Sequence, residues 1–437
     1  MKKPILIITF FLITTAAFAQ NSINKPRLDS LLDVLAANNR KMVNMAISQN
    51  GKIIYQKSTG IASSGVKATA NTKYRVGSIS KMFTATIIFQ LIDAGKLKLS
   101  DPLSKWYPQL PNAEKITIGL MLKHRSGLFN FTADSTYLTY YTQPQTEQQQ
   151  IARFAKLQPA FAPDTKSAYS NTNYVLLAYI AQKITGKPYA LLIKERITGR
   201  LKLNDTYAGG AIDPKKHEAQ SYKYINGWQQ ETATDMSVPG GAGAIVSTPA
   251  DLARFIEGLF NGKLVSDSSL NVMKTLDGRF GSGMFGYSFN EKSGFGHNGS
   301  IDSFNADLSY YPTEKLTIAI CSNGGTYSVN NIGLAALKLY FGQPYQLPVF
   351  SNIKLNEADM DKYVGVYGLA QAAMKITVAK KDDMLTAQAT GQNAFPLEPT
   401  APGKFSFEPA DIVITIDTAK KELNIAQGGH TTLFKKE

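Results

Sequence analysis

Residues 74–91 read YRVGSISKMFTATIIFQL, and this stretch decides how the fold is interpreted. The run from Ser78 to Ala94 predicts a helix that Gly95 ends. It is apolar on nearly every side, so we expect it to be buried all round. Its first turn nevertheless carries Ser78 and, three residues later, Lys81. Residues three apart share a helix face, so the hydroxyl and the amine are expected to meet.

A hydroxyl beside an amine is a candidate pair of nucleophile and base. A serine is a weak nucleophile until a neighbouring base takes its proton, and burial lowers the pKa of a lysine enough to make it that base. The S-x-x-K pattern also occurs at Ser22–Lys25, Ser64–Lys67 and Ser351–Lys354. Of the four matches, only Ser78 and Lys81 open a buried helix, where the alternative interpretation, a serine cap with a surface lysine, fits less well. Ser80 is expected to pack or cap.

Residues 169–171, Tyr-Ser-Asn, precede a second buried helix that is predicted to begin near Thr172. A phenol near a lysine is expected to have a pKa below its usual value of about 10, so Tyr169 would share the proton transfer. Asn171 would accept from Lys81 and donate to a substrate carbonyl. In the alternative interpretation, Tyr169 only packs against the helix and Asn171 or Thr172 caps it.

Residues 296–300, Gly-His-Asn-Gly-Ser, form the third motif, and H-x-G occurs once in the chain. A glycine such as Gly299 in a strand allows a substrate backbone to approach closely. The alternative is that His297 is a half-buried structural histidine. The triplet Lys-Ser-Gly at 292–294 is a rival match, which we assign to the preceding turn.

The rest of the first 345 residues predicts an α+β fold, in which an antiparallel sheet is flanked by helices and carries a mostly helical subdomain. A hairpin is expected around Asn50-Gly51, because these residues tolerate the positive φ angles of a type I′ turn. Later strands are predicted in DLSYYP and KLTIAICSN. Further helices are expected over Pro26–Asn38, from Thr248 to near Gly262, and over Ser328–Tyr340.

The pattern changes after Gly342, where a proline-punctuated stretch predicts a linker over residues 346–358. Short strand patterns dominate residues 359–437 and predict a small, separate all-β barrel. The main domain is assigned to residues 20–345.

Residues 1–19 are predicted to be a cleaved secretory signal. Lys2 and Lys3 precede an apolar run, and Ala-Phe-Ala at 17–19 is a cleavage site before Gln20. The alternative, a membrane anchor, would need roughly 20 apolar residues, more than this run offers. We therefore expect an exported, periplasmic protein. Its single cysteine, Cys321, lies in an apolar strand and is expected to be a buried thiol.

Composition excludes several function classes. The formal charge is +14, or 14 − 2 = +12 without Lys2 and Lys3, but the basic residues are scattered, so no nucleic-acid partner is expected. The four histidines lack metal-ligand spacing, and neither a P-loop nor a dinucleotide motif occurs. We expect no cofactor and no metal, and a monomer.

Together the three motifs resemble those of the serine β-lactamase and penicillin-binding protein superfamily, most closely class C β-lactamases and related D-alanyl-D-alanine carboxypeptidases. The resemblance covers roughly Leu28 to Phe341, and the C-terminal segment is similar to the lipocalin-like appendage of some members. Further family-like stretches are MLKHRSGL at 121–128, FAPDTKSAYSNTNY at 161–174, PGGAGAIVSTPADLARF at 239–255 and GHNGSIDSF at 296–304.

The resemblance implies a role for each motif. Ser78 would be the acylated nucleophile, and Lys81 and Tyr169 would share the acid and base work, with the resting position of the proton left open. Asn171 would orient the substrate and Lys81. The backbone N–H groups of Ser78 and Ser300 would form the oxyanion hole. The remaining motif residues would bind substrate: Gly299 and His297.

Histidine replaces the lysine that the family's third motif usually carries, so His297 would face the leaving group or a substrate carboxylate with less positive charge. The resemblance therefore implies an exported serine hydrolase acting on D-amino-acid peptides, β-lactams or esters. D,D-peptidase or D-aminopeptidase, β-lactamase and carboxylesterase activities remain open, as does a non-catalytic peptidoglycan-binding relative. The C-terminal domain would cover the cleft or contact another envelope component.

Overall fold

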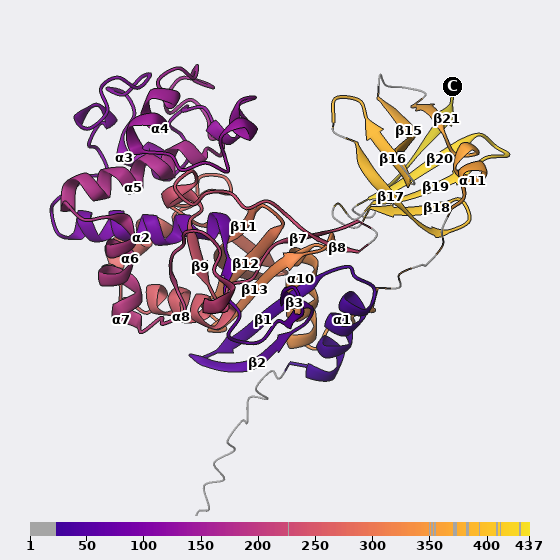
Figure 1. The fold of residues 1–437 in the computed structure, drawn as a ribbon, viewed down its shortest axis with the longest axis horizontal. Helices are drawn as coiled ribbons and strands as arrows, with labels where there is room; N and C mark the ends of the chain where they lie inside the picture. Colours follow the sequence, from indigo (N-terminus) through magenta and orange to yellow (C-terminus); the bar gives the residue numbers. More distant parts are fainter. Residues whose placement is uncertain are drawn as a thin grey trace, which may run out of the picture.

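The fold was analysed in a computed structural model of the chain (Figure 1). The predicted signal peptide lies outside the residues that the structure describes, and no helix within them has the length and apolar character to cross a membrane. The described residues are 23–225, 227–348, 350, 353, 355–369, 374–381, 384–392, 394–407, 410, 412–427 and 430–437.

An antiparallel sheet forms the centre of the main domain, in the order β10-β11-β12-β13-β1-β2, with the short β7–β8 hairpin attached beside β13. The predicted hairpin is confirmed: Asn50 and Gly51 join β1 to β2 with φ angles of 50° and 78°. The strands are β1 Met42–Gln49, β2 Lys52–Ser58, β7 Tyr222–Tyr224, β8 Trp228–Gln230, β10 Phe285–Phe289, β11 Lys292–Ile301, β12 Phe304–Tyr311 and β13 Leu316–Gly324.

Helices bury both faces of this sheet, so the predicted α+β class is confirmed (Figure 1). One face packs against α1 Lys25–Ala37 and α10 Val329–Tyr340, through side chains such as Met45 and Ile320. The other face packs against α2 Ser80–Asp93 and α8 Pro249–Phe260. Cys321 is buried on this second face as a free thiol, as expected.

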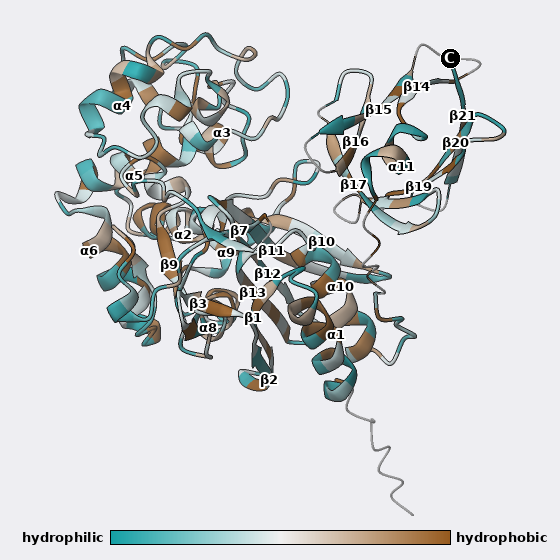
Figure 2. Cartoon of the chain, turned by 45° about the vertical axis from the view of Figure 1, so that its right-hand side comes forward, coloured by the Kyte–Doolittle hydropathy of each residue, from teal (hydrophilic) through white to brown (hydrophobic). Residues whose placement is uncertain are grey.

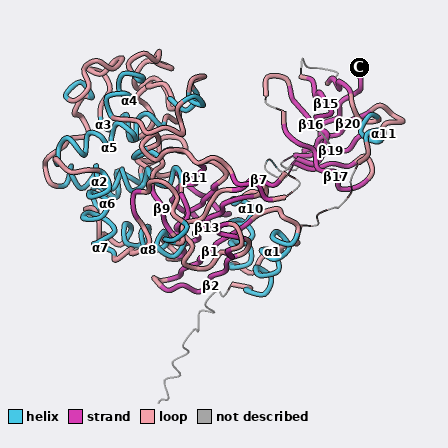
Figure 3. The backbone as a smooth tube through the Cα atoms, viewed as in Figure 1, coloured by secondary structure: helices cyan, strands magenta, loops and turns pink. Residues whose placement is uncertain are grey.

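The helical subdomain lies on the far side of α2 from the sheet (Figure 3). Helix α2 is buried along its length, as predicted, and packs against α5. Helix α5 ends at Gly186, a left-handed cap, where the sequence indicated. The helices of this region are α3 Ile118–Leu122, α4 Glu147–Phe154, α5 Asn171–Thr185, α6 Tyr189–Ile193 and α7 Gly199–Leu201, with α9 Asp267–Lys274 nearby in the main domain. Smaller strands are β3 Ile61–Ser63, β4 Val66–Lys67, β5 Tyr74–Arg75, β6 Tyr207–Ala208 and β9 Ile245–Ser247.

The C-terminal region forms a closed barrel of eight strands in sequential order, which confirms the predicted all-β barrel. Its interior is filled by apolar side chains such as Tyr367, Phe405 and Phe434. A short helix, α11 Glu357–Asp361, precedes it and begins inside the predicted linker. The strands are β14 Gly365–Gly368, β15 Lys375–Lys381, β16 Met384–Ala389, β17 Phe395–Ala401, β18 Lys404–Phe407, β19 Ile412–Asp417, β20 Glu422–Gln427 and β21 His430–Lys436.

Figure 2 shows the hydropathy of the strands. Strand β9, the middle strand of the small sheet β5-β9-β6, is apolar, whereas β21 of the barrel is largely hydrophilic.

The barrel contacts the main domain through an ion pair between Arg40, two residues before β1, and Glu398 on β17. Arg40 also lies over the ring of Phe350, with its guanidinium carbon 4.9 Å from the ring centroid.

Candidate active site

Ser78 lies in a single 3-10 turn, Gly77–Ile79, that leads directly into α2. Strand β11 packs so closely against this turn that a β-carbon on Gly299 would lie 1.9 Å from the carbonyl oxygen of Val76. A β-carbon on Gly77 would likewise lie 2.7 Å from the backbone nitrogen of Ser300. Glycine is therefore required on both sides of the contact, which holds the backbone of Ser300 against the turn that carries Ser78.

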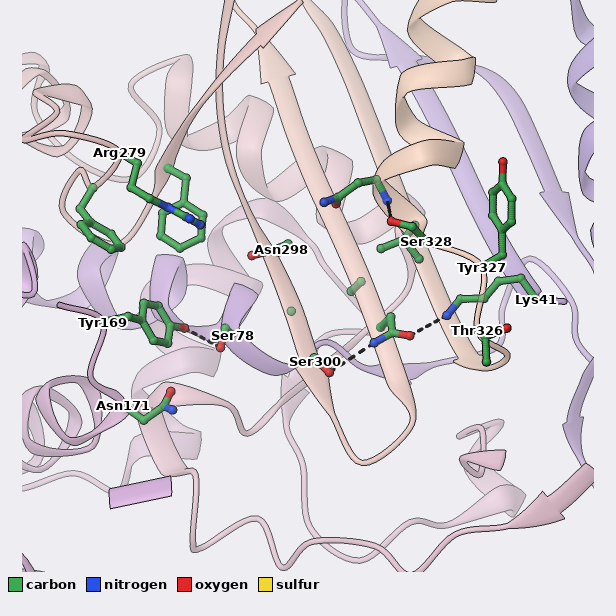
Figure 4. Close-up of a pocket in the computed structure, with 17 residues that line it drawn as sticks. Lys41, Ser78, Tyr169, Asn171, Arg279, Asn298, Ser300, Thr326, Tyr327 and Ser328 are labelled. Atoms are coloured by element: carbon green, nitrogen blue, oxygen red, sulfur yellow. Dashed lines mark hydrogen bonds between the residues drawn. The ribbon is translucent and has the colours of Figure 1, made fainter. Parts of the chain in front are cut away.

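Two side chains from different segments contact the Ser78 hydroxyl. Lys81 Nζ lies 3.0 Å from Ser78 Oγ. The phenol of Tyr169 donates to the same oxygen over 2.7 Å (Figure 4). The first contact arises within the helix and the second comes from the segment before α5, 91 residues away in sequence. The structure thus brings together the three residues that the sequence predicted to be catalytic. Ser80 instead packs inward, where its hydroxyl accepts from the backbone N–H of Ile245.

The Lys81 amine is fully buried and is held by three hydrogen-bonding partners, one of which is Ser78. Its Nζ donates to Asn171 Oδ1 and to the Ala242 carbonyl oxygen, each over 2.8 Å. Burial, with no carboxylate partner among the described residues, holds the pKa of Lys81 well below its usual value. A lysine whose pKa is lowered takes up the proton of a neighbouring hydroxyl less readily than it releases its own, but it is free of charge over a wider pH range than an exposed lysine, which suits it to exchange a proton with Ser78.

Tyr169 departs from the expectation of a lowered pKa. Burial raises the pKa of its phenol above its usual value, against smaller opposite effects of the Ser78 hydrogen bond and the Arg279 charge. The expectation considered only the neighbouring lysine and left out the burial of the phenol itself, which is the largest effect on its pKa. Tyr169 therefore remains protonated at rest and serves as a hydrogen-bond donor to Ser78.

Asn171, the first residue of α5, makes one of its two expected contacts. Its side-chain oxygen accepts from Lys81, as predicted. Its Nδ2 donates to Asn130 Oδ1 and to Thr132 Oγ1, each over 3.1 Å. Both amide hydrogens are therefore engaged, and the amide is fixed in the orientation that presents its oxygen to Lys81.

His297 needs a correction. Its side chain is only 1% exposed and does not line the cavity beside Ser78; instead its ring stacks on Phe285 with the centroids 4.0 Å apart. Its Nδ1 lies 2.5 Å from the carbonyl oxygen of Asn298. Burial is the largest of the effects that lower the pKa of His297 to about 3. A neutral, buried ring does not present a positive charge to substrate, and the structural alternative describes its surroundings better.

The triplet 292–294 is also placed differently from the prediction. These residues are the first three of β11 and not part of a turn. Lys292 pairs with Glu314 over 2.8 Å, five residues along the strand from His297. The rival K-[ST]-G match therefore contributes no side chain to the Ser78 site. Among the described residues there is also no cluster of side chains suited to a metal ion.

Two cavities meet at Ser78. The larger, of about 610 Å³, extends from Tyr169 and Phe285 across the Asn298–Ser300 segment of β11 (Figure 4). The smaller, of about 390 Å³, lies on the other side of the nucleophile and is lined by aromatic residues that include Phe131 and Tyr137. Ser78, Asn171 and Ser300 line both. A scissile bond at Ser78 therefore has separate space for its acyl part and for its leaving group.

A model of the family described as "Beta-lactamase" matches residues 28–340, which is most of the chain. The chain belongs to the beta-lactamase family. It is 26% identical over 415 residues to Penicillin-binding protein 4* of Bacillus subtilis (strain 168), covering 87% of this chain and 91% of that protein. It is also 28% identical over 237 residues to the teichoic acid D-alanine hydrolase of Staphylococcus aureus, covering 52% and 57%.

The fold is similar to the crystal structure of D-amino acid amidase from Ochrobactrum anthropi SV3 complexed with D-phenylalanine. The TM-score is 0.66 at 25% identity, over 72% of this chain and 98% of the amidase. The resemblance to the serine β-lactamase and penicillin-binding superfamily is confirmed, and the chain is a serine hydrolase of that type.

The sequence did not single out His124 as part of this beta-lactamase family site. Its ring centroid lies 4.6 Å from that of Tyr169, and its Nδ1 accepts the backbone N–H of Ser170 over 3.1 Å. Its backbone has a φ angle of 57°, which few residues other than glycine adopt. His124 therefore supports the segment that presents Tyr169. The only signal was its place in the family-like stretch 121–128.

Arg279 was also missed, because a lone arginine in an exposed loop has no motif. It lines the larger cavity, with its guanidinium carbon 4.7 Å from the Phe285 ring centroid. No carboxylate among the described residues pairs with it. A positive charge held over an aromatic ring beside Tyr169 supplies what His297 does not.

Proposed function

We propose that this chain is an exported serine hydrolase that transfers the acyl group of a D-amino-acid amide, peptide or ester to Ser78 and then to water. One observation carries the proposal: Ser78 Oγ contacts both the amine of Lys81, whose pKa is lowered by burial, and the phenol of Tyr169, whose pKa is raised by burial. One partner is poised to accept a proton and the other to donate one, which is what an acyl transfer requires in succession.

In acylation, Ser78 Oγ attacks the substrate carbonyl carbon while its proton passes to Lys81 Nζ. The carbonyl oxygen becomes an oxyanion, which the backbone N–H groups of Ser78 and Ser300 would stabilise. As the bond to the leaving group breaks, Tyr169 gives its proton to the departing nitrogen or oxygen and regains one from Lys81. Water then attacks the ester on Ser78, the same groups carry its proton in the reverse direction, and the free acid leaves.

Substrates containing a D-amino acid are favoured by the comparisons and by the chemistry of the larger cavity. Two of the similar proteins carry names for hydrolysis at a D-amino acid or D-alanine. Neutral His297 offers no positive charge to a β-lactam carboxylate, so such a charge must come from another residue, and β-lactams stay an alternative substrate class. Arg279 lines the same cavity and would attract a carboxylate on a peptide leaving group.

Covalent labelling tests the nucleophile. We expect a fluorescent penicillin, followed by intact-mass analysis, to add one acyl group to the wild type and none to Ser78→Ala. Labelling that survives Ser78→Ala would overturn the assignment. Panels of D- and L-alanine amides, D-alanyl-D-alanine peptides and simple esters then rank the substrates. Preference for simple esters would favour a carboxylesterase, and no turnover of any would favour a non-catalytic peptidoglycan-binding relative.

Export and the barrel complete the proposal. We infer that residues 1–19 direct the chain to the periplasm and are removed at Ala19. The mature chain would act in the periplasm as a monomer, with peptidoglycan within reach. The mass of the protein recovered from the periplasm tests this, and a mature chain that still begins at Met1 would contradict it. Truncation near Phe350 tests the barrel, because unchanged kinetics and stability would exclude a role in covering the cleft.

A further inference from the structure

The larger cavity continues well beyond Ser78, and its far end holds a second lysine. Lys41 lies just before β1 and is only 1% exposed, yet it lines the cavity (Figure 4). Its Nζ donates to Asn305 Oδ1 over 2.6 Å and to the Gly325 carbonyl oxygen over 2.9 Å. Asn305 in turn donates to Ser300 Oγ over 3.2 Å, so hydrogen bonds connect this end of the cavity to the strand beside the nucleophile.

The hydrogen bonds of Lys41 are complete only when its amine is neutral. An ammonium has three N–H groups, and the described residues accept two of them. A buried charge without a counter-ion is costly, and burial accordingly lowers the pKa of Lys41 to about 7. Protonation at neutral pH therefore leaves one N–H group and one positive charge to be satisfied by something that enters the cavity.

The surroundings of Lys41 supply hydrogen-bond donors and no free carboxylate. Thr326 and Ser328 line the same end, and Ser328 caps α10, a helix of 12 residues whose positive end faces this region. The nearby acidic groups are engaged elsewhere: Asp307, on the same face of β12 as Asn305, accepts from Tyr287, and Glu398 pairs with Arg40. The phenol of Tyr327 also lines the cavity.

We propose that this far end of the cavity is a binding site for an anionic group, a carboxylate or a phosphate, with Lys41 as its counter-ion. The anion would belong to a part of the substrate several bonds from the scissile carbonyl, because Ser300 lies between Ser78 and Lys41 (Figure 4) and is connected to Lys41 only through Asn305. As a substrate subsite the inference rests on the proposed function, but anion binding itself does not require hydrolysis.

Sulfate is a suitable probe, because its charge does not change near neutral pH. Calorimetry on the full-length wild type is expected to show binding that tightens as the pH falls from about 8.5 to 6, since Lys41 gains its proton near pH 7. Lys41→Met should weaken this binding by at least about tenfold, whereas Lys98→Met removes an exposed lysine and should leave it unchanged. Lys41→Gln replaces Lys41→Met if thermal melting shows that the latter is unfolded.

Arg279→Met distinguishes the contribution of Arg279 to sulfate binding from that of Lys41, since both residues line the cavity. Sulfate binding that persists in Arg279→Met and disappears in Lys41→Met supports the site. Sulfate binding that disappears only in Arg279→Met overturns the proposed site. Sulfate binding that depends neither on pH nor on Lys41 overturns it as well. A matched pair of substrates ending in a carboxylate or a carboxamide then identifies the subsite, since Lys41→Met should raise KM for the carboxylate alone. If no substrate is turned over, the proposed function fails while the sulfate result still stands.

Discussion

The hydroxyl oxygens of Tyr169 and Ser78 lie 2.7 Å apart, and the tyrosine is the donor. Tyr169→Phe removes this donor and leaves the contact of Ser78 with Lys81 intact. We expect kcat to fall by about 10²–10⁴-fold, the usual range for loss of an acid or base. Rapid-mixing measurements should show that departure of the leaving group is slowed most. A variant with wild-type kcat would remove Tyr169 from the mechanism.

The pH dependence of acylation should report Lys81 and not His297. Lys81 is active as a base when unprotonated, and burial holds its pKa well below the usual value of about 10.4. The rate should therefore reach its plateau well below about pH 10.4, where an exposed lysine loses its proton. His297, with a pKa of about 3, should add no inflection between about pH 5.5 and 8. A rate that rises only near pH 10 would show that Lys81 is charged at rest.

Lys81 should also make stability depend on pH. Its pKa is lower in the folded chain than in the unfolded chain, so the unfolded state binds more protons between the two values. The free energy of unfolding should accordingly rise with pH up to about 10.4, the pKa of an exposed lysine. Lys81→Met lacks this contribution, so the difference in melting temperature between wild type and variant should change steadily over that range. A constant difference would contradict a neutral Lys81.

Arg279 should select substrates that carry a carboxylate near the reacting centre. We expect Arg279→Met to raise KM for a D-alanyl-D-alanine peptide by about tenfold or more, the loss of one charge-assisted contact. KM for D-alanine amide, which has no carboxylate, should be little changed and serves as the control. Equal effects on both substrates would indicate that Arg279 supports the Phe280–Phe285 loop without contacting substrate.

The close contact of β11 with the nucleophile turn predicts a steep cost for any side chain at residue 299. In Gly299→Ala the new β-carbon would lie 1.9 Å from the Val76 carbonyl oxygen, so the strand must move away. Loss of the oxyanion geometry should lower kcat by about 10²–10³-fold while the chain remains folded. Gly210→Ala adds a methyl group with nothing within 4 Å and is the matched control. Equal activity of both variants would refute the role of this contact.

Local patterns in the sequence were sufficient for most elements and for three members of the site. The Asn50-Gly51 turn, the caps of α5 and α8, and the Ser78–Lys81 spacing each depend on a few adjacent residues, which is why they were predictable. The order of the three motifs then indicated Tyr169 as a partner.

What the sequence could not supply depends on packing between distant segments. Lys41 and Arg279 reach the cavity from segments with no motif of their own. The pKa of the Tyr169 phenol was predicted to shift in the wrong direction, because the burial that raises it comes from residues far away in sequence. His297 was expected to face substrate, but strand alternation and stacking on Phe285 direct its ring into the interior.

The pairing of β1 with β13 affects when the active site can form during folding. Met42 pairs with Gly324, so the central sheet joins segments separated by most of the main domain. Contacts this distant form late, because a long loop must close before they contribute. A chain that crosses a membrane from its N-terminus would expose Ser78 long before β11 arrives to complete the oxyanion hole. Activity would then begin only after nearly the whole main domain has emerged.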